Sequence, residues 1–559
     1  MRIFSFVWAI LLLFSCARQG TPTGGPRDEE PPKFISANPD TLSLQVSTDL
    51  KEINLQFDEY LVLKDHTQNI IISPPLGSTA TFTPVGSPSK NIRIKLNEAL
   101  QANTTYNINF GQAIQDNNEG NKLPYFQYVF STGDFIDSLE INGRVRVPFL
   151  RKQPEHLMVG LYKVDSTYSD SLLIKKKPFY VAKVNEKGAF KLNYLSAGKY
   201  QLMAFDDELQ NMQYDFGKEK FGFYDEIIDF QENNAVDYSL NLFDQKKDYR
   251  AGKAEQKGYG HLLFRFEGEP EDISVEALDF NFTTASNDFQ ARQDSMNFWF
   301  DPSIDSIEER TRRIHFLVKH KTQVDSVSLV YSNATKHQLK LEKLSKLSEA
   351  PNRKVDFHSN YPIARLDSTQ VKVWKDTLQL PVKITPHLTS KQAFSMEFPI
   401  ELNAQYDIEF LPELVTDIFG KTNDSLTFSF QTKTKNELGN LGLNLVGKPA
   451  HPFWLQLLNE KDEVLVEEYT QAAEFNFPYL QPGNYYFKIL VDENENGHWD
   501  TGDFFLRKQA EKAFIYPTLI NVRPLWEMVE TWQLSDEKLP KATEEAVEEE
   551  TVSNEKSPS

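Results

Sequence analysis

Short stretches in which apolar and polar residues alternate recur along the chain from residue 34 onward. A period of two places successive side chains on opposite faces of an extended backbone, so each stretch predicts a half-buried β-strand. Turn-forming clusters at residues 116–120 and 185–188 separate such stretches, and long runs with the helical period are missing. The pattern predicts an all-β chain of sandwich domains. Examples of the alternation are Ile53, Leu55 and Phe57, then Tyr106, Ile108 and Phe110, and later Phe475 and Phe477.

Two sequence patterns each occur twice. A constant offset over many positions is hard to obtain by chance, so we infer two domain types, A and B, each present twice. Two unrelated sandwiches could also share part of this alternation. In type A, Phe57, Tyr106, Ile108, Phe110, Gly120, Phe130 and Thr132 recur 300 residues later as Phe357, Tyr406, Ile408, Phe410, Gly420, Phe430 and Thr432. In type B, Phe190, Tyr194, Leu195, Gly198, Tyr200, Asp207, Asp215 and Gly217 recur 285 residues later as Phe475, Tyr479, Leu480, Gly483, Tyr485, Asp492, Asp500 and Gly502.

The repeats divide the chain into modules in the order A, B, a further β-rich domain, A, B. Such a chain is expected to form a rod or a curved stack. The predicted segments are a lipoprotein signal peptide at 1–15, a lipidated Cys and flexible tether at 16–32, the first type A domain at 33–134, the first type B domain at 135–250, the β-rich domain at 255–348, the second type A domain at 350–434, the second type B domain at 435–533 and a disordered acidic tail at 534–559.

The N-terminal stretch has the layout of a secretory signal. It carries one early positive charge and an apolar core from Ile3 to Phe14, which is too short to span a bilayer. Cys16 follows directly, and Leu13 and Ser15 before it resemble a bacterial lipobox, in which the thiol is acylated, for example by palmitate. Several acyl chains would hold the protein on a membrane. The alternative is an ordinary secretory signal that ends in Cys.

Composition narrows the possible functions. Cys16 is the only cysteine in 559 residues, so no disulfide framework exists and each module must be stabilised by burying apolar surface. The formal net charge is −20, which disfavours nucleic-acid binding because neutralising phosphates requires clustered Lys and Arg. The tail after Trp532 is acidic and free of aromatic residues, so it cannot bury a core.

Type A resembles the SbsA-type Ig-like domain of bacterial surface proteins. The resemblance rests on Asp58-Glu59-Tyr60 after Phe57, on residues 103–108 and on the closing Phe130-Ser131-Thr132. Residues 22–32 resemble the start of Bacteroidota lipoproteins that carry this domain. Type B, with Phe190 and the turn at 195–200, is similar to prealbumin-like or carboxypeptidase-regulatory-like sandwiches.

The resemblance implies an outer-membrane lipoprotein, lipid-anchored and exposed on the cell surface. It further implies a scaffold or accessory subunit of an envelope complex, with an integral outer-membrane β-barrel protein as partner. The β-barrel assembly machinery is the most specific partner that the resemblance suggests. A sandwich fold by itself does not fix a function, since such modules host unrelated activities.

Residues 492–503 have the spacing of a calcium loop. Oxygen-bearing side chains stand at positions 1, 3, 5, 9 and 12, Gly497 is at position 6, and His498 at position 7 would offer its backbone carbonyl. Asp503 replaces the usual Glu at position 12. The alternative is an Asx-rich turn whose carboxylates cap backbone amides. The repeat partner at 207–217 fits calcium less well. The predicted Ca²⁺ ligands are Asp492, Asn494, Asn496, His498, Asp500 and Asp503.

The sequence favours a non-enzymatic role. It contains no His-Glu-x-x-His, no Gly-x-Ser-x-Gly, no phosphate-binding Gly-Lys-Ser/Thr and no second cysteine. A small-molecule substrate is therefore not expected. The alternative function is carbohydrate or surface binding through the loops of the type B domains. Trp499, with Phe504 and Phe505, would then form a sugar-stacking platform, whereas the plainer hypothesis is that these rings pack the loop against its own sandwich.

Overall fold

The computed structural model confirms the all-β prediction over the residues that it describes, which are 28–76, 80–232, 236–289, 293–305, 307, 311–344, 347, 349–388 and 390–534. Within them the helical segments are short turns, and no helix there is long and apolar enough to cross a membrane. The predicted signal peptide, Cys16, the tether up to residue 27 and the tail after residue 534 lie outside the described residues. The helical turns are α2 (His66–Asn69), η1 (Asp170–Leu172), η2 (Ser368–Gln370) and η3 (Lys435–Glu437).

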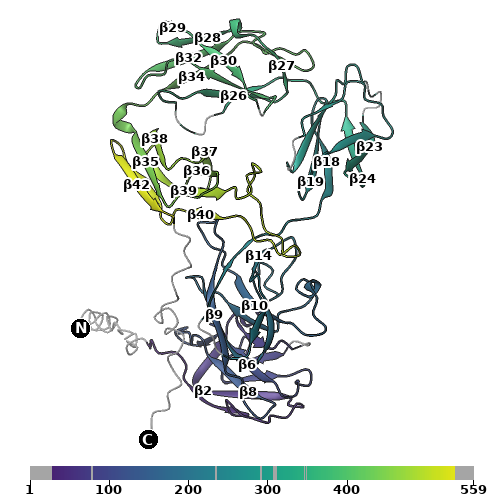
Figure 1. The fold of residues 1–559 in the computed structure, drawn as a ribbon, viewed down its shortest axis with the longest axis vertical. Coiled ribbons are helices and arrows are strands. Elements are labelled where there is room, and N and C mark those ends of the chain that lie inside the picture. Colours follow the sequence, from purple (N-terminus) through teal and green to yellow (C-terminus); the bar gives the residue numbers. More distant parts are fainter. Residues whose placement is uncertain are drawn as a thin grey trace, which may run out of the picture.

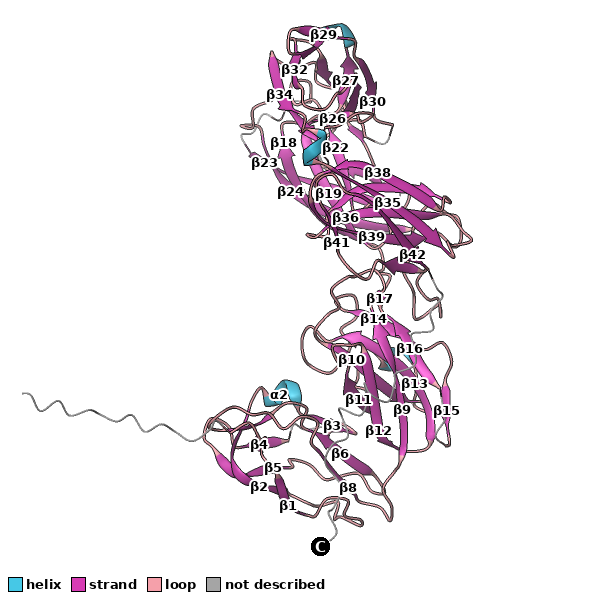
Figure 2. Cartoon of the chain, turned by 90° about the vertical axis from the view of Figure 1, so that its left-hand side faces the viewer, coloured by secondary structure: helices cyan, strands magenta, loops and turns pink. Residues whose placement is uncertain are grey.

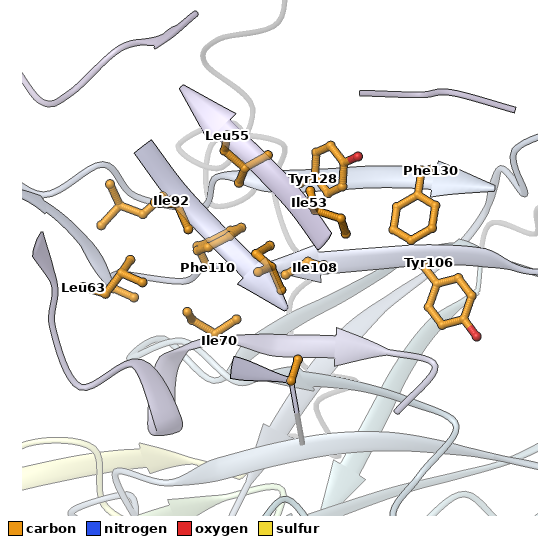
Figure 3. Packing of buried hydrophobic residues seen from close by; sticks show 14 of the residues in the cluster. Ile53, Leu55, Leu63, Ile70, Ile92, Tyr106, Ile108, Phe110, Tyr128 and Phe130 are labelled. Carbon is orange, nitrogen blue, oxygen red and sulfur yellow. The ribbon is translucent and has the colours of Figure 1, made fainter. Parts of the chain in front are cut away.

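The first Ig-like module buries the alternating residues of its strands between two sheets. In β2, Ile53, Leu55 and Phe57 are fully buried, whereas the polar residues between them are not. One sheet has the order β1-β2-β5-β4, with β7 on β2, and the other has the order β3-β6-β8. Tyr106 and Phe130 stack at 5.4 Å between ring centroids in this core (Figure 3). The strands are β1 (Phe34–Asn38), β2 (Glu52–Leu63), β3 (Ile71–Ser73), β4 (Thr81–Thr83), β5 (Ser89–Lys95), β6 (Thr105–Asn109), β7 (Ile114–Asp116) and β8 (Gln127–Ser131).

The first prealbumin-like module has a larger and a smaller sheet. The larger has the order β11-β10-β13-β14-β17, with β15 on β13, and the smaller has the order β12-β9-β16. β16 runs parallel to β9, and the other pairs in the module are antiparallel. The strands are β9 (Leu139–Arg146), β10 (Leu157–Lys163), β11 (Tyr180–Lys183), β12 (Ala189–Leu195), β13 (Gly198–Asp206), β14 (Lys220–Phe223), β15 (Ile228–Phe230), β16 (Asp237–Asn241) and β17 (Phe243–Asp244).

The middle module is a sandwich of the sheets β18-β19-β22-β21 and β20-β23-β24. The aromatic rings of Phe264, Phe298 and Phe316 meet in its core. Its first strand begins at Arg250, so the predicted start at residue 255 is too late. The strands are β18 (Arg250–Gly258), β19 (His261–Glu267), β20 (Ser274–Ala277), β21 (Ser286–Asn287), β22 (Ser295–Trp299), β23 (Thr311–His320) and β24 (Gln323–Ser332).

The second Ig-like module contains the sheets β25-β26-β31-β30 and β29-β28-β32-β34, together with the pair β27-β33. β25 lies before the predicted start at residue 350, and its pairing with β26 shows that this boundary was wrong. The strands are β25 (Leu341–Leu344), β26 (Val355–Ser359), β27 (Ile363–Leu366), β28 (Val371–Lys375), β29 (Leu378–Leu380), β30 (Lys383–Pro386), β31 (Ala393–Glu397), β32 (Gln405–Phe410), β33 (Val415–Asp417) and β34 (Leu426–Gln431).

The second prealbumin-like module repeats the topology of the first. Its sheets are β37-β36-β39-β40, with β41 on β39, and β38-β35-β42, in which β42 is parallel to β35. The strands are β35 (Gly439–Val446), β36 (Phe453–Asn459), β37 (Val464–Thr470), β38 (Glu474–Leu480), β39 (Gly483–Val491), β40 (Ala513–Ile515), β41 (Ile520–Val522) and β42 (Glu527–Gln533).

The modules close into a ring, whereas the sequence predicts a rod or a curved stack. In Figure 1 the chain runs from the first prealbumin-like module through the middle and second Ig-like modules to the second prealbumin-like module, and a loop of that last module reaches back to the first. Arg507 and Asp170, which are 337 residues apart in sequence, pair across this contact at 2.8 Å. The first Ig-like module lies outside the ring, against β11 and β12 (Figure 2). Alternation within strands carries no information about such a contact between modules.

Candidate functional site

The closure of the ring depends on one loop, residues 492–512, which joins β39 to β40 and is called the clasp loop below. Its first half holds most of the predicted calcium ligands. Asp492 is fully buried, and its two carboxylate oxygens accept hydrogen bonds from the backbone N–H groups of Asn496 (3.0 Å) and Gly497 (2.8 Å). The Tyr469 hydroxyl donates to Oδ2 of the same carboxylate at 2.8 Å. Asp492 therefore fixes the turn by capping backbone amides.

Asp500 is the second organising carboxylate. Its Oδ2 accepts from the side-chain amides of Asn494 (2.7 Å) and Asn496 (3.0 Å), and Lys508 Nζ lies 3.3 Å from the same oxygen. The structure thus brings Asp492, Asn494, Asn496 and Asp500 into one turn. The carboxylates of Asp492 and Asp500 both accept hydrogen bonds from groups of the protein.

Of the two remaining predicted ligands, Asp503 lies outside this turn and His498 lies within it. The Asp503 carboxylate accepts from the backbone N–H groups of Phe505 (2.9 Å) and Leu506 (3.2 Å), so it caps the next bend of the loop. His498 has an exposed side chain, and its N–H donates to Asn496 Oδ1. Among the described residues, no three His, Cys, Asp or Glu side chains are grouped to hold a metal ion. This arrangement matches the Asx-turn alternative, and calcium binding stays a prediction.

Glu511 is a functional residue of this loop that sequence reasoning missed. Its buried carboxylate accepts from the backbone N–H groups of Glu493 (3.0 Å), Asn494 (3.2 Å) and Asp500 (2.7 Å). Burial raises the pKa of Glu511, and the negative charges of Asp500 and Asp492 add to this effect. Glu511 therefore holds the two ends of the turn together.

The first prealbumin-like module contains the same arrangement in a shorter loop. There Glu219 accepts from the N–H groups of Leu209 (3.3 Å) and Asp215 (2.8 Å). Asp215 and Asp500 are 285 residues apart, whereas Glu219 and Glu511 are 292 apart. A comparison at a constant offset of 285 residues therefore aligns Asp215 with Asp500 but no longer aligns Glu219 with Glu511. The second copy therefore has extra residues between Asp500 and Glu511, and these form the outer half of the clasp loop.

The extra residues insert a phenylalanine into the first prealbumin-like module. Phe504 is 2% exposed and joins the cluster of that module, not the core of its own sandwich. Its ring centroid lies 5.1 Å from Phe223 and 6.0 Å from Phe221, both in edge-to-face geometry. The hypothesis that Phe504 packs the loop against its own sandwich is therefore wrong. The rings of the cluster that Phe504 joins include Phe205, Tyr214, Phe221, Phe223 and Phe243.

Polar contacts surround the inserted ring. Arg507 stacks over Phe504, with its guanidinium carbon 4.2 Å from the ring centroid. The same guanidinium donates to Asp170 Oδ1 (2.8 Å) and to Gln201 Oε1 (3.0 Å) of the first prealbumin-like module. The Gln509 amide donates to the Phe223 carbonyl at 3.0 Å. We call this set of contacts, with Phe504 at its centre, the clasp.

The partner surface of the clasp includes an insertion of its own. Asp170 lies in residues 164–179, which connect β10 to β11, whereas the equivalent connection between β36 and β37 in the second copy is only residues 460–463. Each copy of the prealbumin-like module therefore carries an added segment that the other copy lacks. These two segments meet through Arg507 and Asp170.

Gly502 is required by the close approach of the two modules. A Cβ placed on it would stand 2.4 Å from Phe243 Cζ and 2.5 Å from Phe243 Cε2, closer than side-chain atoms tolerate. The Thr501 hydroxyl donates to the Asp244 carbonyl beside it. Gly502, which the type B repeat aligns with Gly217, therefore permits the contact with the first prealbumin-like module.

Trp499 takes part in the same interface. Its ring packs edge-to-face on Phe149 of the first prealbumin-like module at 5.5 Å, and its Nε1 donates to the Glu511 carbonyl at 3.1 Å. A cleft of about 540 Å³ lies beside it between the two modules. The prediction that Trp499 packs against its own sandwich missed this contact. Phe505 is 45% exposed and lies 5.9 Å from Phe216.

Comparison with known proteins supports the Ig-like part of the fold. Residues 28–132 match the family model of the bacterial Ig-like domain, which agrees with the predicted resemblance of the first module. No curated protein matches the chain. Origin in a Bacteroidota lipoprotein stays a prediction.

Solved structures similar to the chain include an S-layer protein, a pilin subunit and a protein of a glucan utilization locus. The S-layer protein rSbsC is 12% identical, with 89% of this chain and 68% of that chain covered and a TM-score of 0.14. The major pilin subunit BcpA of Bacillus cereus is 10% identical, with 71% and 99% covered and a TM-score of 0.12. SGBP-B of Bacteroides ovatus, solved with a mixed-linkage heptasaccharide, is 8% identical, with 69% and 92% covered and a TM-score of 0.16. At these TM-scores the likeness carries no argument about this chain.

We expect that Phe504→Ala opens the ring. The change removes a buried ring from the Phe221 and Phe223 pocket, and such truncations cost about 3–5 kcal/mol. Small-angle scattering should then show a larger radius of gyration. Leu506→Ala is the matched control, because Leu506 belongs to the same loop but is 75% exposed. Gly502→Val should act like Phe504→Ala. Unchanged scattering for both variants would show that other contacts hold the ring closed.

The calcium hypothesis predicts a change in thermal stability. If the turn from Asp492 to Asp500 binds Ca²⁺, millimolar calcium should raise the melting transition of the second prealbumin-like module, since a ligand that binds only the folded state stabilises it. Magnesium at the same concentration is the control. The absence of a shift would leave the turn as a hydrogen-bonded Asx structure without metal.

The buried Glu219 predicts a pH dependence of stability. Burial raises the pKa of Glu219 to about 7 from an ordinary value of 4.5, and Asp207 and Asp215 add to this effect. The folded state then binds the proton more tightly than the unfolded state, so this contribution is complete below pH 4.5 and is lost as the pH rises to about 7. The free energy of unfolding of the first prealbumin-like module should fall by on the order of 2–4 kcal/mol over that pH range.

Glu219→Gln should remove this loss, because a neutral amide does not titrate. The comparison to make is the change in melting temperature between pH 5 and pH 8 for the full chain and for the variant. Glu226→Gln, an exposed carboxylate of the same module, is the control. Equal pH slopes for Glu219→Gln and the unaltered protein would contradict the assignment.

Proposed function

We propose that the chain is a non-enzymatic outer-membrane lipoprotein that acts as a scaffold or accessory subunit of an envelope complex at the cell surface. The observation that carries this proposal is the clasp. Sandwich modules joined only by linkers can change their relative angles, whereas a ring closed by Phe504 and Arg507 fixes four modules at set distances. A fixed frame suits a protein whose task is to hold partners in place.

Short connections between modules add to this frame. Residues 132–138 connect β8 to β9, residues 245–249 connect β17 to β18, and residues 432–438 connect β34 to β35. Such short segments leave each module little freedom to reorient, because the span of a chain is limited by its length. The repeated sandwiches then act as spacers of defined size.

In this proposal Cys16 carries the acyl chains and residues 17–32 form the tether. The anchor would place the first Ig-like module nearest the membrane, with the ring beyond it. Acyl anchoring on one cysteine requires more than one chain for stable attachment. The partner that we propose is an integral outer-membrane β-barrel protein, with the β-barrel assembly machinery as the most specific candidate. This choice of partner rests on the sequence resemblance.

A carbohydrate-binding platform at Trp499 is the weaker candidate. The Trp499 ring and its Nε1 are engaged by Phe149 and by the Glu511 carbonyl. A ring that supports a stacked sugar needs an open face. Because these contacts belong to the clasp, replacing Trp499 would disturb the ring as well as any sugar binding.

Affinity purification in mild detergent tests the scaffold proposal. The full chain, tagged after residue 559 and expressed in its native membrane, should recover an outer-membrane barrel protein that mass spectrometry identifies. Phe504→Ala should reduce recovery of the barrel protein while keeping the chain on the membrane, and Leu506→Ala should not. Cys16→Ser should release the chain from the membrane. Recovery of no barrel protein by the unaltered chain would rule out the proposed partner.

A further inference from the structure

The first Ig-like and first prealbumin-like modules meet in a fixed joint. Ile71 in β3 is 4% exposed and belongs to the same cluster as Met158 and Val181 of the prealbumin-like module. The Val181 N–H donates to Ser73 Oγ at 3.3 Å. Figure 2 shows β3 and β6 beside β11 and β12, so this joint is made by strands on both sides. A cleft next to such a joint is preformed.

A polar cleft of about 450 Å³ lies along this joint. Its volume falls within the usual range of ligand pockets, about 300–1,000 Å³. Side-chain amides from both modules dominate its walls, and each amide can both donate and accept hydrogen bonds. Tyr125 is the aromatic residue of the lining. The amide-bearing residues are Asn69, Asn109, Gln112, Gln127, Asn185 and Asn193.

The cleft carries positive charge in a chain that is strongly acidic overall. Lys183, Lys187 and Lys191 line it, together with the single acidic residue Glu186. Lys191 pairs with Glu140 at 3.1 Å. Among the described residues, neither Lys183 nor Lys187 forms an ion pair, and Lys183 Nζ donates to the neutral Asn69 Oδ1 at 3.0 Å. Two ammonium groups of the cleft are therefore able to meet an anion.

Two acceptors without a donor lie next to the cleft. A small cavity of about 20 Å³ shares part of its lining with the cleft, and its walls include Asn107 and Asn193. The buried Oδ1 atoms of these two side chains have no hydrogen-bond partner within the described protein. A buried carbonyl oxygen without a donor is costly, so a water in the small cavity that bridges to a bound ligand would be stabilising.

Backbone strain marks the rim of the cleft. Tyr125 has a φ of 58°, in the left-handed region that residues other than glycine rarely adopt. Its N–H donates to the carbonyl of Gly111, which has a φ of 53°. Strain of this kind costs of order 1–3 kcal/mol and is concentrated at functional sites. The strained turn places the Tyr125 ring at the cleft.

The second pair of modules lacks this chemistry at the matching positions. Strand register aligns Asn107 with Asp407 and Lys183 with Tyr469. The amide-rich and basic lining therefore belongs to the first pair alone, although the fold is common to both. The second copy has Asp407, Glu409, Leu411 and Thr427 for Asn107, Asn109, Gly111 and Gln127, and Asn476 and Pro478 for Lys191 and Asn193.

We propose that this cleft binds a short acidic saccharide, in which amides recognise ring hydroxyls and Lys183 and Lys187 bind a sugar carboxylate. Charge-assisted bonds from ammonium groups to a carboxylate are stronger than neutral ones. Glu186 and the overall charge of −20 disfavour long polyanions, so the site takes a short run of uronate units at the end of a glycan. The site is independent of the scaffold role and of the clasp.

Calorimetric titration of the full chain tests this site. The probes are trigalacturonic acid and a hyaluronan tetrasaccharide, and the trimethyl ester of trigalacturonic acid is the matched neutral control. We expect at least one acid probe to bind, with an affinity that falls as salt is raised, and the ester to bind about tenfold more weakly or not at all.

Two double variants distinguish binding in the cleft from nonspecific charge attraction. Lys183→Met with Lys187→Met should weaken binding of the acid probe about tenfold or more, whereas Lys176→Met with Lys177→Met, on exposed positions of the same module, should leave it unchanged. Circular dichroism and melting establish that both double variants fold. Equal weakening by both pairs, equal binding of the ester, or binding of neither acid probe would each overturn the proposal.

Discussion

The arrangement of the modules depends on one buried aromatic ring, that of Phe504, in a pocket of the first prealbumin-like module. Each module has its own core and its own sheets. What turns a series of modules into a ring is the burial of this side chain against Phe221 and Phe223, with Arg507 above it. Edge-to-face packing and a cation over a ring are favourable individually. Their combination at one point gives the contact its specificity.

Much of the fold follows from the sequence because strands leave a local signal. The alternation of Ile53, Leu55 and Phe57 fixes which face of β2 is buried, and the recurrence of that pattern at Phe357 locates a second module of the same kind. The turn from Asp492 to Asp500 is likewise local, because carboxylate and amide side chains bond backbone groups a few residues away. In such cases the nearby residues determine the geometry.

The clasp could not be predicted in the same way. Phe504 follows a run of turn residues, and nothing near it in the sequence states that its partner is Phe223, far earlier in the chain. Glu511 was missed for a related reason. The clasp loop is longer than its counterpart in the first copy, so the repeat is shifted by several positions after Asp500. A search that allowed insertions between Asp500 and the next strand would have aligned Glu511 with Glu219. The starts of the middle module at residue 250 and of the second Ig-like module at residue 341 follow from strand pairing, which the alternation of apolar and polar residues does not show.

The distance in sequence between the two halves of the clasp has a kinetic consequence. Arg507 and Asp170 are separated by 337 residues, so their contact has one of the largest loop-closure costs in the chain. Each sandwich can gain its stability from contacts within itself, and contacts of long sequence separation form late. During synthesis the pocket of Phe221 and Phe223 is complete before Phe504 has been made. The unclosed chain therefore passes through a stage in which this aromatic pocket is open, and the last module to fold is the one that covers it.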